Sequence, residues 1–150
     1  MQGIIKAICV SEQKGTEKHP VPAAHLTAHH GIDGDAHAGP WHRQVSLLSY
    51  EKVEEFNQRG AQVTDGAFGE NLLVSGIDFR TLPVGTILET AHAKLRITQI
   101  GKECHSHCAV YQRVGTCIMP REGVFAEVLV GGDLKPGEIM TVTPVSEDKE

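Results

Sequence analysis

A short segment in the last third of the chain carries two thiols and two imidazoles within five residues, Cys-His-Ser-His-Cys at 104–108. On a helix, Cys104, His107 and Cys108 would share one face, and in an extended chain Cys104 and Cys108 still would. Lys102 and the histidines favour the thiolate, which is the nucleophilic and metal-binding form of cysteine. We therefore predict that Cys104 is a reactive or metal-ligating thiol, with Cys108 and His107 as further metal-ligand candidates.

Two other interpretations of these cysteines stay open. Structural zinc uses a pair of ligands two to four residues apart and a second pair elsewhere in the chain, and Cys117 or His37 could complete such a set. Small thiols are also often buried as part of a core. Three of the four cysteines fall within 14 residues, which favours a thiol site over a disulfide framework.

A second candidate lies in a stretch rich in Gly, Asp and His between residues 31 and 48. Glycines allow the backbone to approach a ligand closely. The Arg43 guanidinium, which precedes Gln44, is a forked donor for carboxylate or phosphate. Asp35 could orient His37 or cap a turn. The structural alternative is a Gly-rich turn held by Asp side chains.

A third candidate is the pair Glu70 and Asn71, which stands directly before an expected strand. Polar groups in this position either bind a ligand or satisfy backbone groups of the loop. The pattern alone favours the structural role.

The elements that must position these residues are mostly short strands, because Gly and Pro recur between apolar runs. Ser49 suits a helix N-cap and Gly60 a helix stop, which predicts a helix over about 50–59. Residues 11–24 and 29–41 are expected to form loops. Many short strands with one or two helices predict a closed or nearly closed β-barrel. The expected strands span residues 4–10, 44–48, 71–74, 86–89, 95–100, 125–130 and 139–143.

Length and composition are those of one ordinary domain spanning residues 1–150, with 40% apolar residues. The net charge of −5 disfavours generic binding to nucleic acid or to an anionic membrane. The N-terminus lacks the apolar core of a signal peptide, and no apolar stretch approaches the ~18 residues of a membrane span. We expect a cytoplasmic protein with reduced cysteines and with neither nucleic acid nor membrane as partner.

In their order along the chain, these segments resemble the MOSC domain, the C-terminal domain of molybdenum cofactor sulfurases. The resemblance covers roughly residues 20–143 and looks like the short, stand-alone bacterial type. It implies a mostly β fold with one or two helices, whose β-barrel resembles the small barrel domain of pyruvate kinase. The matching stretches are Gly34-Asp35-Ala36-His37, His42-Arg43-Gln44-Val45-Ser46-Leu47-Leu48, Phe68-Gly69-Glu70-Asn71-Leu72, the cysteine segment, Gly115-Thr116-Cys117-Ile118-Met119-Pro120 and Gly123-Val124-Phe125.

The resemblance also implies which residues carry function. The family's hallmark is one cysteine that ligates molybdenum or carries sulfur as a persulfide, and Cys104 occupies its place. Glu103 stands where longer relatives often have proline. Pyridoxal phosphate is ascribed to the family broadly, but we do not expect it here because the chain is too short to hold the domain that binds it. The residues implied around the cofactor pocket are Asp35, His37, Arg43, Gln44, Glu70, Asn71 and Lys102.

The ligand implied is molybdenum cofactor. The domain would act as a cysteine-based sulfur carrier or sulfurtransferase, or as a cofactor-dependent reductase, and Cys108 could resolve a persulfide on Cys104. The expected protein partners are a molybdoenzyme or a cysteine desulfurase. The alternatives are a zinc-stabilised binding module without catalysis and a chaperone that delivers the cofactor.

Overall fold

The computed structural model describes residues 1–13, 18–58, 65–66, 68–101 and 123–144. Within them no helix is long and apolar enough to cross a membrane.

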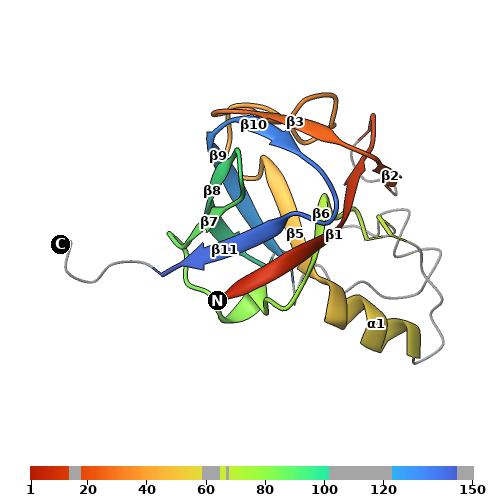
Figure 1. Cartoon of the computed structure of the whole chain (residues 1–150). Coiled ribbons are helices and arrows are strands. Elements are labelled where there is room, and N and C mark those ends of the chain that lie inside the picture. Colours follow the sequence, from red (N-terminus) through yellow and green to blue (C-terminus); the bar gives the residue numbers. More distant parts are fainter. Residues whose placement is uncertain (14–17, 59–64, 67, 102–122, 145–150) are drawn as a thin grey trace.

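The central element is a closed β-barrel of seven strands (Figure 1). Their order around the barrel is β11-β7-β8-β9-β5-β6-β1, and a pairing of β1 with β11 closes the ring. Neighbouring strands are antiparallel except β5 and β6, which are parallel and are joined by the helix α1 (Tyr50–Gln58). The barrel strands are β1 (Gln2–Val10), β5 (Val45–Ser49), β6 (Leu72–Ser75), β7 (Ile87–Glu89), β8 (Lys94–Ile100), β9 (Val124–Val130) and β11 (Ile139–Thr143).

Strand β1 closes the barrel because it pairs with three strands at different points along its length. Gln2–Ile4 pairs with β11, Ile4–Ile8 pairs with β6, and Ile8–Val10 pairs with the short strand β2 (His19–Val21). Gly3 permits the closure: a Cβ atom at this position would lie 2.4 Å from the backbone oxygen of Ser75.

A small second sheet covers one end of the barrel (Figure 1). It contains β10 (Gly132–Leu134), β3 (Ala24–Thr27) and β4 (Gly31–Ile32) in that order. One buried side chain from each strand, Leu134, Leu26 and Ile32, joins the barrel core. The small sheet therefore closes this end of the barrel with apolar side chains and holds the chain that leads into residues 33–44.

Two apolar clusters stabilise the fold. The larger one fills the barrel interior with branched aliphatic side chains and Phe79, which lies in the 3-10 helix η1 (Phe79–Thr81). The smaller one lies between the barrel wall and α1, where Val53 packs against Leu48 and Phe68. All five residues of β5 are buried because the strand faces the interior on one side and the second cluster on the other.

The strands and the helix expected from the sequence are confirmed, with boundaries within two residues wherever they are described. Ser49 uses its hydroxyl to join Ile77 O and Phe79 N, which ties the start of α1 to the segment after β6. The expectation of loops over 11–24 and 29–41 was wrong in part, because β2, the start of β3 and β4 fall there. Strands of two to four residues show no alternation long enough to be detected, and β2 carries Pro20.

Candidate functional site

The predicted cysteine segment, with Lys102, Cys104, His107 and Cys108, lies outside the described residues. The described chain stops at Gly101, after β8, and resumes at Gly123, before β9. Gly101 N donates to Gly123 O at 2.7 Å, so the last described residue before the segment lies beside the first one after it.

Next to this point is a polar group that we call the β8 corner, formed by His42, Arg43, Gln99 and Phe125. Gln99 Oε1 accepts from Arg43 Nε at 3.1 Å and lies 2.8 Å from His42 Nε2, while Gln99 Nε2 donates to Gly101 O at 2.7 Å. The Arg43 guanidinium lies over the Phe125 ring, 5.2 Å from its centre. Within the described part of the chain, the two terminal nitrogens of Arg43 have no hydrogen-bond partner.

A second group, which we call the buried pair, is the ion pair between Lys18 and Asp35. Lys18 Nζ lies 2.8 Å from Asp35 Oδ1, and both side chains are fully buried. Burial opposes ionisation of Asp35, but the hydrogen bond and charge of Lys18 and the backbone N–H groups of His37 and Ser11 outweigh it, so the pKa of Asp35 lies below its ordinary value. Lys18 also reaches Ser11 Oγ at 3.0 Å and His37 Nδ1 at 3.1 Å.

Two aromatic contacts connect the buried pair with the β8 corner. The Trp41 indole lies parallel to the His37 ring, with 6.4 Å between centres and an interplanar angle of 5°. Its Nε1 donates to His37 O at 2.8 Å. The Trp41 ring also contacts His42 edge to face, with 5.9 Å between ring centres. The structure thus brings His37 and Arg43, both predicted site residues, into one continuous network.

Gln44, the next predicted residue, follows Arg43 in the chain and is buried. Its Oε1 accepts from the backbone N–H of Val128 at 2.9 Å. Gln44 therefore ties the start of β5 to β9, one residue after Arg43.

Asn71 joins three segments of the backbone. Its Oδ1 accepts from Ser46 N at 2.9 Å, and its Nδ2 donates to Cys9 O at 3.0 Å. The side chain is fully buried. Asn71 therefore holds β1, β5 and the start of β6 together.

Glu70 is also fully buried and holds its own loop. Its carboxylate accepts from Gly66 N at 2.7 Å and from Phe68 N at 3.1 Å. Burial raises the pKa of Glu70 to about 7, although these N–H groups favour the ionised form. Gly66 O in turn accepts from Lys18 N at 2.8 Å, so the Glu70 loop also fixes the backbone that carries the buried pair.

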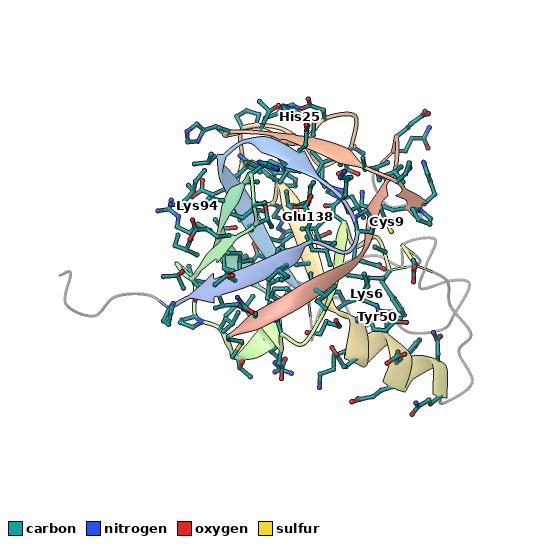
Figure 2. The ribbon with its side chains drawn as sticks, viewed as in Figure 1. Lys6, Cys9, His25, Tyr50, Lys94 and Glu138 are labelled. Carbon is teal, nitrogen blue, oxygen red and sulfur yellow. The ribbon has the colours of Figure 1, made fainter. Side chains whose placement is uncertain are left out.

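The one described cysteine, Cys9, lies on β1 (Figure 2), and its side chain is buried in the second apolar cluster. Burial, with the negative charge of Glu70, raises the pKa of its thiol to about 12. A thiol in this environment stays protonated at neutral pH and is a poor nucleophile. Reactivity of a described thiol is therefore not expected.

Several residues of the network were not singled out from the sequence: Lys18, Ser11, Trp41 and Gln99. Lys18 stands in a polar stretch that is typical of an exposed loop, and its partner Asp35 is 17 residues away. The sequence offered one signal for Gln99, which lies near the end of a predicted strand, two residues before Gly101. No signal pairs it with His42, which is 57 residues away.

The described network is suited to binding an acceptor-rich or anionic ligand. Arg43 offers a forked cationic donor, and His37, His42 and Trp41 add rings beside it. Within residues 1–13, 18–58, 65–66, 68–101 and 123–144, no three His, Cys, Asp or Glu side chains are placed to hold a metal ion.

Comparisons with known proteins agree with this architecture. The family model described as "MOSC domain" matches residues 29–141. The YuaD protein of Bacillus subtilis superposes with a TM-score of 0.82 at 18% identity, over 97% of this chain and 98% of that one. YiiM of Geobacillus stearothermophilus gives 0.71 at 20% identity over 95% and 75%, and YiiM of Escherichia coli gives 0.70 at 19% over 97% and 71%. A search of curated proteins gave no match.

Proposed function

The chain belongs to the MOSC domain family, and from that premise we propose that it binds molybdenum cofactor at the β8 corner, with Cys104 as the thiol that meets the cofactor. The cofactor pairs an anionic, phosphate-bearing pterin with a molybdenum ion. The proposal therefore requires a cationic, donor-rich surface and a thiol within reach of each other.

The observation that carries the proposal is the state of Arg43. Gln99 and the Phe125 ring hold its guanidinium in place, while its terminal nitrogens have no partner within the described part of the chain. A guanidinium fork held in this way matches the two oxygens of a phosphate. His42, bonded to the same Gln99 oxygen, adds a second ring beside it.

Chain connectivity supports the choice of Cys104 as the thiol. Gly101 accepts from Gln99 and therefore belongs to the same corner as Arg43. Cys104 follows three residues later, and three residues of chain span at most roughly 11 Å. Lys102, which lies even closer in sequence, would add a second cation for the phosphate.

The remaining predicted residues would support the cofactor site indirectly, by holding the loops around it. Asp35, Gln44, Glu70 and Asn71 each accept a hydrogen bond from a backbone N–H group, and all four side chains are buried. We propose that they hold the loops that present Arg43 and His37. When bound, the cofactor would supply a molybdenum centre for redox chemistry or for acceptance of sulfur.

The test is to purify the protein without air from a host that makes the cofactor. We expect molybdenum and pterin in equal amounts, and loss of both in Arg43→Gln. Arg96→Gln serves as the matched control, because Arg96 pairs with Glu127 on the outer surface of β8 and β9. Equal cofactor content in the two variants would show that Arg43 does not bind the cofactor.

The role of Cys104 is tested on the same preparations by trapping persulfides with an alkylating reagent and mass spectrometry. A persulfide on Cys104 that disappears when apo-molybdoenzyme is added identifies a sulfur carrier, and a cysteine desulfurase would then be its source. Cofactor bound without a persulfide, and lost in Cys104→Ser, identifies a molybdenum ligand. Protein with neither cofactor nor persulfide, but with stoichiometric zinc whose removal unfolds it, would overturn the proposal.

A further inference from the structure

The buried pair determines how His37 can use its two ring nitrogens. Lys18 Nζ lies 2.8 Å from Asp35 Oδ1, 3.0 Å from Ser11 Oγ and 3.1 Å from His37 Nδ1. A lysine ammonium has three donors and no acceptor. These three contacts therefore account for all of its protons.

The direction of each hydrogen bond follows from its partners. Asp35 accepts backbone N–H groups on both oxygens, from Ser11 at 3.1 Å and from His37 at 3.0 Å, so it is ionised, and a fully buried carboxylate requires a cation beside it. The Ser11 hydroxyl donates its own proton to Gln13 O at 3.0 Å, which leaves it an acceptor for Lys18. The third ammonium proton is directed at His37 Nδ1.

We propose that Lys18 is a positioning residue that fixes His37 in the tautomer with its proton on Nε2, so that His37 is a hydrogen-bond donor to the ligand and does not ligate a metal ion. Nδ1 accepts from Lys18, and an Nδ1–H group would face a donor-only ammonium. Metal ligation through Nε2 requires the proton to move to Nδ1, and Lys18 opposes this move. His37 would therefore not complete a zinc site with the cysteines.

The atom that His37 binds is therefore an acceptor, such as an oxygen of a phosphate or of a pterin ring. This second part rests on the proposed function, whereas the tautomer does not. The placement supports it, because the His37 ring stacks on Trp41 and Trp41 contacts His42 of the β8 corner. His37 and Arg43 would then both donate to the same ligand.

The tautomer is measured directly by long-range ¹H–¹⁵N correlation on histidine-labelled protein at neutral pH. We expect His37 to show the pattern of a neutral ring protonated on Nε2, unchanged by one equivalent of Zn²⁺. A ring protonated on Nδ1 or on both nitrogens would overturn the inference, as would loss of the Nε2 proton when zinc is added.

The dependence on Lys18 is tested with the double variant Lys18→Met/Asp35→Asn, which removes both charges and leaves no lone buried ion. We expect its His37 to populate both tautomers and its ring nitrogens to respond to Zn²⁺. Lys6→Met is the matched control, since Lys6 is an exposed lysine that lies over the Tyr50 ring (Figure 2), and it should behave as wild type. An unchanged single tautomer in the double variant would show that Lys18 is not the determinant.

The donor role is tested by the amount of pterin that copurifies from the cofactor-producing host. His37→Gln keeps an amide N–H near the position of Nε2, so we expect its content to stay within about threefold of wild type, against a loss of about ten- to a hundredfold in His37→Phe. Equal losses in both variants would overturn the donor role. Wild-type protein without any cofactor would instead overturn the proposed function, while the tautomer measurement would still decide the role of Lys18.

Discussion

Buried side chains that bond to backbone define the site at the scale of single residues. Asn71 joins three segments of chain, Gln44 fixes β9, and Glu70 holds the loop that carries Gly66. Removal of any of them leaves backbone N–H or C=O groups buried without a partner, which costs about 1–3 kcal/mol for each group. These residues therefore affect ligand binding through the loops they hold.

Glu70 gives the site a stability that depends on pH. Its pKa of about 7 in the folded protein lies above the ordinary value of 4.5, so the folded state binds the proton more tightly. The free energy of unfolding should therefore fall between about pH 4.5 and pH 7 by at most about 3 kcal/mol. Urea unfolding of wild type and Glu70→Gln at several pH values measures this, and the stability of wild type relative to the variant should fall as pH rises. Glu89→Gln, an exposed control, should show no such change, and parallel curves for Glu70→Gln would contradict the prediction.

The buried pair predicts a strong coupling between two charges. Lys18→Met alone leaves Asp35 ionised and unpaired, and should lower the free energy of unfolding by about 3–5 kcal/mol. The double variant with Asp35→Asn should recover much of this loss, which a double-mutant cycle with the two single variants measures. Because the folded pKa of Asp35 lies below its ordinary value, the stabilisation is present above that value and is lost as pH falls through the folded pKa. Additive effects of the two substitutions would show that the charges do not interact.

At the scale of elements, the barrel depends on the pairing of β1 with β6 and β11. Gly3 lies where these strands meet, and the atoms nearest to an added Cβ are Ser75 O at 2.4 Å and Ile77 Cγ1 at 2.8 Å. The Ser75 atom belongs to the backbone, so it cannot move aside without displacing β6. This junction of β1 with β6 and β11, which we call the seam, has no room for a side chain at position 3.

Gly3→Val should therefore destabilise the barrel by about 2–4 kcal/mol or prevent its closure. Thermal unfolding followed by circular dichroism measures the change, with Ile4→Val as control, since Ile4 is the next residue and its side chain is exposed. A Gly3→Val protein as stable as wild type would mean that the seam is looser than the structure shows.

The small sheet carries an ion pair that responds to pH. His25 Nδ1 lies 2.8 Å from Asp133 Oδ1 and joins β3 to β10. The hydrogen bond to Asp133 raises the pKa of His25, so the stabilisation is complete below the ordinary value of 6.5 and is lost as pH rises through the folded pKa. An NMR titration should show a lower His25 pKa in Asp133→Asn and no change in Asp78→Asn. The same pKa in both variants would contradict the prediction.

At the scale of the whole molecule, the sequence predicted the barrel strands, whose apolar residues recur in a pattern, and the fold, whose motifs resemble a known family. Residues 95–98 alternate apolar and polar residues, which favours a strand. Glu70 and Asn71, for which the pattern alone favoured a structural role, bond to backbone groups. Lys18 could not be predicted, because its burial depends on Asp35, Ser11 and His37 meeting in space. The strands β2, β3, β4 and β10 were missed because two to four residues show no period.

The closing seam between the first and last barrel strands also determines when folding can be completed. During synthesis, β1 emerges more than 130 residues before β11, and its edge stays open until β11 has left the ribosome. Contacts so distant in sequence are formed late and slowly, and an open strand edge can pair with other chains. In the nascent chain the open edge of β1 is therefore an aggregation hazard, which β11 removes only when it pairs with Gln2–Ile4.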